Sequence, residues 1–370
     1  MSERIPLLLP QLPSADALLP YLQQIDGNRW YTNFGPLVRQ LESRISENFM
    51  REPAPVQVVT VANGTVGLEL ALAALGLKRG TKVLLPALTF VATASAALRV
   101  GYLPLICDVD PESWLLTPTI ARAMLQQQPF DVVMPVATFG VPQPVGEWDN
   151  FTAETGIPVV IDAAGAYGNQ AIGVTTRVVF SLHATKALGA GEGGLVASRQ
   201  FSFAEKVRQL SNFGIDFTSG GLVFDPGENG KMSEYHAAIA HAALDAWEKT
   251  CATRLDLQQQ YQRALVQHCP SVQVQRRPAS GIYPIQVVLL PEGVQAKRVQ
   301  SALLDYLIES RQWYCPTLDI HPAFAGYKAG DLPISHALSV RLLGLPYSID
   351  MTDAQIEHVC MCLHDILGVN

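Results

Sequence analysis

Between residues 56 and 198 the chain alternates short, continuous runs of apolar residues with longer stretches of helical character. The apolar runs have the length of single strands and are rich in β-branched residues, as expected for strands covered on both faces. They are VQVVTVA, TKVLLP, YLPLICDV, DVVMPVA, IPVVID, RVVFSL and GLVAS. Between them the pattern predicts helices over residues 65–77, 91–99 and 119–127. This alternation predicts an α/β domain with a large, mainly parallel sheet and helices on both faces.

After about residue 204 the pattern changes. Helical patterns dominate residues 234–267, and they are followed by a strand in GIYPIQVVLL, a helix over 295–311 and a closing helix over 352–367. We therefore predict a large domain with an N-terminal arm over residues 1–230 and a smaller α+β domain over residues 231–370. The Gly- and Pro-rich stretch 219–230 is interpreted as a long loop.

The composition of the 370 residues narrows the class of protein. Hydrophobic residues make up 48% and charged residues 16%, so the chain can bury a large core. The net charge of −7 argues against a binder of nucleic acid or of anionic membranes. No apolar run reaches the ~18 residues of a membrane span, and the start, MSERIPLLLPQLP, is interrupted by charges and prolines, unlike a signal peptide. We expect a cytoplasmic protein with no nucleic-acid or membrane partner.

The six cysteines are scattered, and none of them forms a CxxC pair. Cys360 and Cys362 are two residues apart in a helical pattern, so they point to different faces of the helix. We interpret all six as buried thiols of a protein in a reducing compartment and predict no metal site.

Two segments of the large domain bring polar groups to the ends of strands. In VVTVANGTVGLELALAALGL, a strand leads through Gly64 and Thr65 directly into a helix, whose N-terminal N–H groups attract phosphate. A plain N-cap is the alternative. In GIPVVIDAAGAYG, Asp162 closes an apolar strand, where a buried carboxylate needs a cation or a strong donor. The alternative is a capping aspartate at a strand-to-helix turn.

A third segment, RVVFSLHATKALGAGEGGLVAS, places Lys186 between a buried strand and a glycine-rich loop. A desolvated lysine has a lowered pKa and can attack a carbonyl carbon, although most lysines are solvated surface charges. The GxGxxG in the same segment leads into a strand instead of opening a helix, so it does not predict a dinucleotide site. A phosphate cradle, a buried acid and a reactive lysine, in this order along an α/β sheet, are the parts that hold pyridoxal phosphate.

Motifs along the whole chain share one family pattern: NRWYTNFGP, ANGTVGLELAL, PALTFVATASA, ICDVDPESWLL, VIDAAGAYG, SLHATKALGAGEGG, LSNFGID, GENGKMSEYHAA, WYCPTLDIHPAF and LGLPYSIDMTDAQIEHV. Through them the chain resembles the DegT-type (DnrJ/StrS-like) sugar aminotransferases of fold type I nearly end to end. The SxHxTK segment followed by GEGG is the most specific of these motifs. The resemblance implies a transaminase that uses pyridoxal 5′-phosphate and passes through its pyridoxamine phosphate form.

The resemblance also implies roles for individual residues. Lys186 would bind the cofactor as a Schiff base, and Asp162 would pair with the pyridine nitrogen. Gly64, Thr65 and Ser181 would contact the phosphate. For Ser181, an ordinary turn hydroxyl is the alternative.

Further residues of the site follow from the same resemblance. Phe90 would stack on the cofactor ring, and Asn229 would reach the phosphate from the neighbouring subunit. His183 and His321 would lie near the substrate. The alternatives are a core role for Phe90 and His183 and a loop position of left-handed geometry for Asn229. At Gly165 the chain departs from the family pattern, which has His or Gln there within reach of the cofactor's 3-hydroxyl.

The family implies a glutamate donor and a keto-sugar nucleotide acceptor. RIPLLLPQLP, NFGI and NGKMSE are most similar to enzymes that act on a dTDP-4-keto-6-deoxyhexose and supply 4-amino-4,6-dideoxy sugars for O-antigen or other polysaccharide synthesis. Amination at C3 and a non-catalytic regulator that keeps the fold are the alternatives. The presence of Lys186, where sugar dehydratases of this fold have histidine, favours amination. We also predict a homodimer with sites at the interface, because the 219–230 loop is otherwise unexplained.

Overall fold

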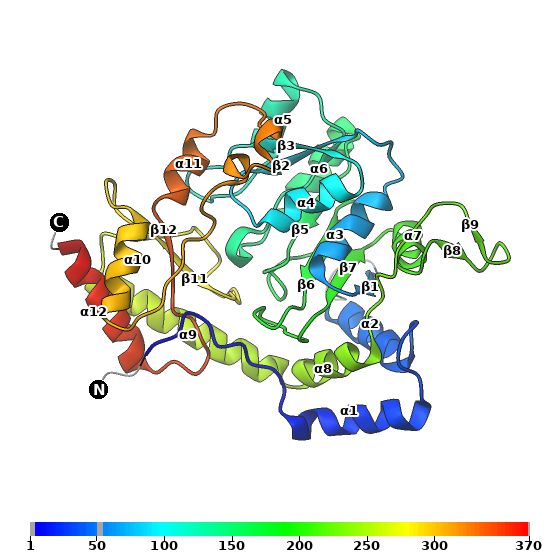
Figure 1. Ribbon diagram of the computed structural model, residues 1–370, viewed down its shortest axis with the longest axis horizontal. Helices are drawn as coiled ribbons and strands as arrows, with labels where there is room; N and C mark the ends of the chain where they lie inside the picture. Colours follow the sequence, from blue (N-terminus) through cyan, green and yellow to red (C-terminus); the bar gives the residue numbers. More distant parts are fainter. Residues whose placement is uncertain (1–3, 50–54, 369–370) are drawn as a thin grey trace.

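The computed structural model describes residues 4–49 and 55–368, and Figure 1 shows its arrangement. Two sheets, β1-β7-β6-β5 and β3-β2-β4, meet through parallel bridges that pair Val133 with Val159 and Val136 with Asp162. Together they form the central sheet. Its strands are β1 (Gln57–Val61), β2 (Lys82–Pro86), β3 (Leu103–Cys107), β4 (Val132–Val133), β5 (Val160–Asp162), β6 (Arg177–Ser181) and β7 (Gly194–Ser198).

The direction of the strands decides where the functional loops gather. β2 pairs in parallel with β3 and β4, and β5 pairs in parallel with β6. Only β7 runs antiparallel to its neighbours β6 and β1 among the strands described in this sheet. The sheet is therefore mainly parallel, as the apolar runs predict. The carboxyl ends of β1, β2, β5 and β6 share one edge, which is where open α/β sheets bind ligands.

Helices cover both faces of the sheet, because neighbouring residues of a strand point to opposite sides. Val58 and Val178 pack in one apolar cluster, and Val59 and Val179 pack in another. The first cluster is covered by α1 (Ala15–Asn28), α2 (Pro36–Asn48), α5 (Pro118–Gln127), α6 (Val145–Thr155) and α8 (Glu234–Asp245), and the second by α3 (Gly64–Ala73), α4 (Val91–Arg99) and α7 (Phe201–Ser211).

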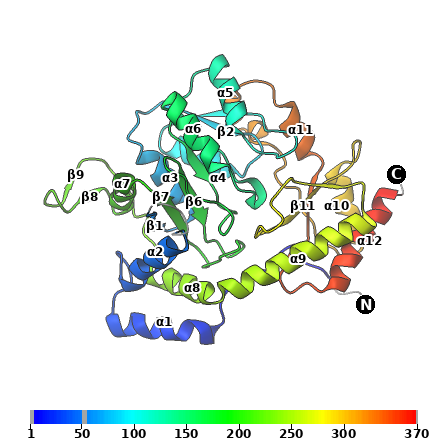
Figure 2. The same cartoon turned by 180° about the vertical axis from the view of Figure 1, so that it is seen from behind.

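A further apolar core, in addition to the two clusters on the faces of the central sheet, lies around the antiparallel sheet β10-β11-β12. The long helix α9 extends from the end of α8 to this core, as Figures 1 and 2 show from opposite sides. Ile5 near the N-terminus joins the same core and pairs with Ile308. The remaining elements are α9 (Trp247–His268), β10 (Gln273–Val274), β11 (Gln286–Leu289), α10 (Ala296–Asp305), α11 (Pro333–Ser339), β12 (Leu342–Leu345), α12 (Asp353–Gly368) and the 3₁₀ turns Thr138–Gly140, Leu318–Ile320 and Ala325–Tyr327.

The helical patterns expected over 234–267 are confirmed and form two helices, α8 and α9, which meet at Ala246, where φ and ψ are −95° and 4°. Two other expectations from the sequence need correction. The helix expected over 295–311 ends at Asp305, and Leu307 then takes a left-handed φ of 61°. The stretch 219–230 is not one irregular loop, because β9 (Leu222–Val223) pairs with β8 (Ile215–Asp216) in a hairpin that projects from the body of the molecule.

The expectation that every cysteine is buried is also wrong in part. All six thiols are free, and four of them are buried, but Cys251 and Cys315 are only half-buried. Cys251 lies in the first turns of α9, and Cys315 lies in the irregular segment between α10 and the turn at Leu318–Ile320, so neither position is enclosed by a sheet and a helix layer.

The boundary between the predicted domains, residues 1–230 and 231–370, stays a prediction. Residues 1–3 and 369–370, at the outer ends of these domains, lie outside the described residues. None of the helices within 4–49 and 55–368 combines the length and the apolar character that crossing a bilayer requires.

Candidate active site

The start of α3 forms a cradle of donors at the carboxyl edge of the sheet. The Asn63 side chain caps this helix by accepting a hydrogen bond of 2.9 Å from the Val66 N–H. The N–H groups of Gly64 and Thr65 bind no other group in the described part of the chain. The N-cap expected as the alternative is therefore present, and two further donors still point to the open end of the helix.

Gly64 brings this helix end against the end of β6. A Cβ atom at Gly64 would lie 2.9 Å from Ser181 Cβ and 3.3 Å from Ser181 Oγ. Only glycine allows this close approach, and it places the Ser181 hydroxyl beside the free N–H groups. The Ser181 Oγ also accepts a hydrogen bond of 3.2 Å from the His183 N–H. The three groups together suit an anion with several acceptor oxygens, such as a phosphate.

The N-terminus of α2 shows what a helix end looks like when its donors are used. There the carboxylate of Glu234, which is 1% exposed, accepts hydrogen bonds of 2.9 Å from the N–H groups of Leu37 and Val38. A side chain from α8 thus takes the place that an anionic ligand could occupy. No described residue plays that part at the start of α3.

Asp162 ends β5 and is 5% exposed. One carboxylate oxygen accepts a hydrogen bond of 2.8 Å from the Thr93 hydroxyl, and the other accepts one of 3.1 Å from the Ala164 N–H. Burial raises the pKa of Asp162, while these two donors and the charge of Lys186 oppose the rise. The carboxylate would therefore gain from a further cation, such as a protonated ring nitrogen.

Lys186 lies in the turn that follows β6. Backbone hydrogen bonds shape this turn, since the Lys186 N–H donates to the His183 carbonyl and the Ala184 N–H donates to the Gly191 carbonyl, both at 2.9 Å. The side chain is half-buried, and its amine makes no hydrogen bond or ion pair within the described residues. Burial lowers the pKa of Lys186, and the negative charge of Asp162 opposes this effect. Lowering the pKa increases the share of neutral amine, which is the nucleophilic form.

Aromatic rings border the space in front of Asp162. Phe90 is 54% exposed, which contradicts the core alternative. Its ring centroid lies 6.2 Å from that of Tyr314, which in turn stacks on Phe139 at 5.4 Å. Burial raises the pKa of Tyr314, and the negative charge of Asp162 adds to the rise. The phenol therefore stays protonated and can act as a hydrogen-bond donor.

The two histidines expected near the substrate, His183 and His321, interact less with the residues described above. His183 lies beside Lys186 in the same turn, but its ring is exposed and its Nδ1 lies 2.9 Å from Thr185 Oγ1. A satisfied core histidine is therefore excluded. The His321 ring is half-buried and packs edge-on against Phe324 at 6.2 Å. Within the described residues, neither ring forms a hydrogen bond or a ring–cation contact with the Lys186 side chain.

Two further positions singled out by the sequence lie at the margin of the site. Asn229 is exposed and bridges to Asn212, and the next residue, Gly230, accepts a hydrogen bond of 2.7 Å from the Ala62 N–H at the exit of β1. Gly165 faces Pro284, whose Cγ would lie 3.5 Å from a Cβ atom at this position. No polar side chain therefore projects from residue 165.

Sequence reasoning did not assign a role to Thr93 or Tyr314, although both lie in quoted family motifs. Thr93 is a polar residue in the Ala-rich start of α4, and this polarity is a signal that could have marked it. Tyr314 gives no comparable signal, because an aromatic residue in an irregular segment is usually part of a core. Only the tertiary contacts bring it close to Asp162.

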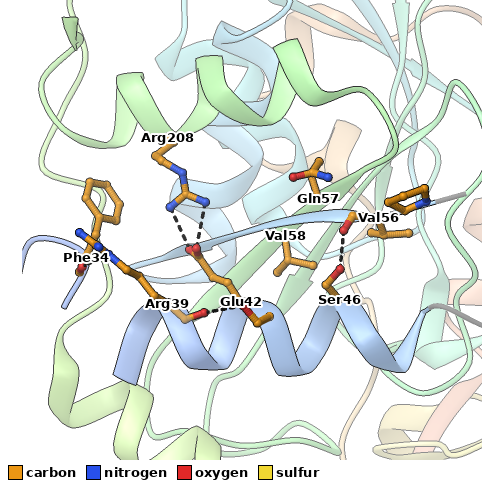
Figure 3. Close-up of a pocket in the computed structure, with 10 residues that line it drawn as sticks. Phe34, Arg39, Glu42, Ser46, Val56, Gln57, Val58 and Arg208 are labelled. Carbon is orange, nitrogen blue, oxygen red and sulfur yellow. Dashed lines mark hydrogen bonds and ion pairs between the residues drawn. The ribbon is translucent and has the colours of Figure 1, made fainter. Parts of the chain in front are cut away.

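A cavity lies away from these residues, where α2, β1 and α7 meet (Figure 3). It has a volume of about 490 Å³. Arg208 and Glu42 form an ion pair of 2.9 Å at its wall, and Glu42 also accepts hydrogen bonds from the N–H and hydroxyl of Thr60. No cluster of side chains suited to a metal ion occurs in the described ranges.

The donors at the α3 terminus, the unpaired amine of Lys186, the buried carboxylate of Asp162 and the exposed ring of Phe90 fit pyridoxal phosphate. The fold and these groups define a pyridoxal-phosphate-dependent aminotransferase of fold type I. The sequence profile of the DegT/DnrJ/EryC1/StrS aminotransferase family matches residues 14–364, and the chain belongs to this family of sugar aminotransferases.

Individual relatives agree with this assignment. The chain is 29% identical to Protein Rv3402c of Mycobacterium tuberculosis strain H37Rv, with 98% of this chain and 90% of the relative covered. It is 31% identical to a solved chain from Bacillus cereus ATCC 10987, named as a PLP-dependent aminotransferase, with a TM-score of 0.90 and coverage of 98% and 100%. DesI, solved in the presence of its TDP-sugar product, is 28% identical, with a TM-score of 0.87 and coverage of 100% and 95%.

Proposed function

We propose that the protein transfers the amino group of glutamate to C4 of a dTDP-4-keto-6-deoxyhexose. The products are 2-oxoglutarate and a 4-amino-4,6-dideoxyhexose nucleotide. The observation that carries the transaminase chemistry is the half-buried amine of Lys186, which has no hydrogen-bond partner in the described chain and lies under the electrostatic influence of Asp162.

When bound, pyridoxal phosphate supplies an aldehyde and an electron-accepting ring. Gly64 and Thr65 would bind its phosphate through their backbone N–H groups, and Ser181 would add its hydroxyl. Asp162 would hold the proton on the ring nitrogen, and Thr93 fixes the orientation of that carboxylate. Lys186 would hold the aldehyde carbon through its Nζ. When free, that Nζ would take the proton from the substrate carbon that bears nitrogen and return it.

Two observations support the choice of substrate. The NFGI and NGKMSE segments resemble those of enzymes for dTDP-4-keto-6-deoxyhexoses, and DesI, which aligns over the whole of this chain, was solved with a TDP-sugar product. Binding of the remote nucleotide contributes to catalysis as well as to affinity, so the free keto-sugar should be poor in kcat and not only in KM.

NMR of the aminated product tests the substrate and the position together. Nitrogen at C4 is the expected result. Nitrogen at C3, or no turnover of any 4-keto sugar nucleotide with glutamate, contradicts the proposal. Borohydride reduction followed by peptide mapping tests the cofactor chemistry separately, because the label should lie on Lys186 whichever sugar is used.

We further propose a homodimer in which Asn229 reaches the phosphate bound by the other subunit. The exposure of Asn229 and the projecting β8–β9 hairpin support this arrangement. Mixing inactive Lys186→Ala and Asn229→Ala proteins should restore activity, since a mixed dimer has one site with both defects and one with neither. Activity no higher than that of the two parents contradicts the shared site.

A further inference from the structure

Arg311, in the segment between α10 and the turn at Leu318–Ile320, is an exposed cation without a carboxylate partner in the described part of the chain. Its guanidinium carbon lies over the Trp313 ring, 4.4 Å from the ring centroid. The side chain donates no hydrogen bond within the described residues. A guanidinium group keeps its charge in proteins, so these N–H groups are free to bind an anion.

The backbone fixes the position of this cation. The Arg311 N–H donates to the Gly344 carbonyl at 3.1 Å, and the Gly344 N–H donates to the Arg311 carbonyl at 2.7 Å, which ties the segment to β12. A Cβ atom at Gly344 would collide with the Trp313 ring, so only glycine lets this ring lie directly against the strand. The ring under the Arg311 guanidinium is therefore held in place.

A row of aromatic rings connects Arg311 with the candidate active site. The Trp313 ring meets the Tyr314 ring edge-on at 5.9 Å, and the Tyr314 ring lies 6.2 Å from that of Phe90, measured between centroids. Burial raises the pKa of Tyr314, the negative charge of Asp162 adds to the rise, and the positive charge of Arg311 opposes it. Both charges therefore lie within electrostatic range of the same phenol.

We propose that Arg311 binds the diphosphate of the nucleotide-sugar substrate. This inference rests on the proposed transaminase function. The sugar carbon that receives nitrogen has to reach Lys186, whereas the diphosphate is attached through the anomeric carbon and lies farther out. The exposed guanidinium at the outer end of the row of rings fits that position, and its fork of N–H groups matches two oxygens of a phosphate.

The overall charge of the protein makes a local cation necessary. At a net charge of −7 the protein as a whole repels a diphosphate, so individual cations have to attract it. Glutamate suits the position of Arg311 less well, because it is short and both of its carboxylates stay near the carbon that bears nitrogen. The Tyr314 hydroxyl, which makes no hydrogen bond within the described residues, offers a second donor beside Arg311.

Calorimetric titration of dTDP into the full-length protein loaded with cofactor tests the site without turnover. Arg311→Gln should raise the Kd of dTDP by about tenfold or more, because charge-assisted hydrogen bonds are lost. Arg311→Lys should have an intermediate Kd, since an ammonium group has no fork. Arg298→Gln, at another exposed arginine of the C-terminal region, is the matched control and should leave Kd unchanged. An equal Kd for wild type and Arg311→Gln overturns the proposal.

Half-reaction kinetics distinguish the diphosphate from the amino donor. Glutamate alone converts the cofactor to its pyridoxamine phosphate form, which is followed by absorbance. Arg311→Gln should change the half-saturating concentration of glutamate by less than about twofold, while it raises KM for the sugar nucleotide. A large rise for glutamate would assign Arg311 to a donor carboxylate and overturn the proposal.

UDP and GDP, titrated in parallel, separate this site from the choice of substrate. If one of them binds in place of dTDP and its Kd depends on Arg311, the diphosphate site is confirmed and the nucleotide of the proposed substrate is wrong. If dTDP binds through Arg311 but glutamate does not convert the cofactor, the transaminase function fails and the diphosphate site stands. If none of the three nucleotides binds to the wild type, the diphosphate site is overturned.

Discussion

The candidate active site and the cavity at Arg208 differ in how their polar groups are used. At the cavity, the Glu42 carboxylate forms an ion pair with Arg208 (Figure 3). It also accepts hydrogen bonds from the N–H and hydroxyl of Thr60. At the active site, the donors of the α3 terminus and the amine of Lys186 have no partner within the described residues. The groups with the chemistry therefore do not lie in the cavity of about 490 Å³ at Arg208.

This difference shows that unmet polar groups mark a ligand site better than volume does. A charged group that already has its partners gains little from a ligand, whereas a desolvated group without one gains a great deal. On this view, substitutions at the active site should reduce function and leave stability nearly unchanged. Substitutions at the Glu42–Arg208 pair should reduce stability and leave function nearly unchanged.

The largest effect is expected for Lys186→Ala. Turnover should fall by a factor on the order of a thousand or more, because both covalent binding and proton transfer depend on this amine. The Tm of the protein freed of cofactor should not fall, since the substitution removes a half-buried amine that has no hydrogen-bond or ion-pair partner within the described residues. Lys297→Ala, at an exposed lysine, is the control. Turnover of Lys186→Ala near that of the control would contradict the assignment.

Asp162→Asn comes next. A neutral amide cannot hold the proton on the ring nitrogen, so turnover should drop about a hundredfold while the fold is kept. Thr93→Val should act in the same direction but less strongly, because it removes only one hydrogen bond to the carboxylate. Steady-state kinetics and circular dichroism check both variants. A near-normal rate for Asp162→Asn would make this residue structural.

Glu42→Gln should lower stability and leave turnover nearly unchanged, the opposite of the active-site variants. It removes the shorter of the two ion pairs of the half-buried Arg208, which then keeps only Glu205 at 3.5 Å, and it should lower the free energy of unfolding by about 2 kcal/mol. Urea unfolding measures this loss. Turnover at saturating substrate should stay within about twofold, as expected for a change at a site without unmet groups. A large loss of turnover with unchanged stability would give this cavity a functional role and break the comparison.

The smallest expected effect is on the pH dependence of stability. In the folded protein, burial lowers the pKa of Lys186 below 10.5, the ordinary value that applies in the unfolded chain. At any pH between the folded and the unfolded pKa, the unfolded chain therefore binds more protons. The stability of the cofactor-free protein contributed by this group should therefore rise with pH across that window. Lys186→Met should flatten the rise. Thermal unfolding at several pH values checks this, and equal slopes for both proteins would contradict the buried state of the amine.

The sequence determined the parts of this protein that depend on local patterns. Apolar runs located the strands of the central sheet, because strands covered on both faces cannot carry charge. The same logic marked Asp162, the charged residue that closes such a run, and Lys186, which lies four residues after the end of another at Leu182. The segment at Gly64 and Thr65 marked the start of a helix, because a strand led through it directly into a helical pattern.

The tertiary structure decided which groups from distant segments meet. Thr93 supports Asp162 only because α4 begins beside the end of β5. Tyr314, from a segment after α10, comes close enough to interact electrostatically with the same carboxylate. Such facts depend on strand order and packing between segments far apart in the chain, and local hydrophobic patterns carry no information about them.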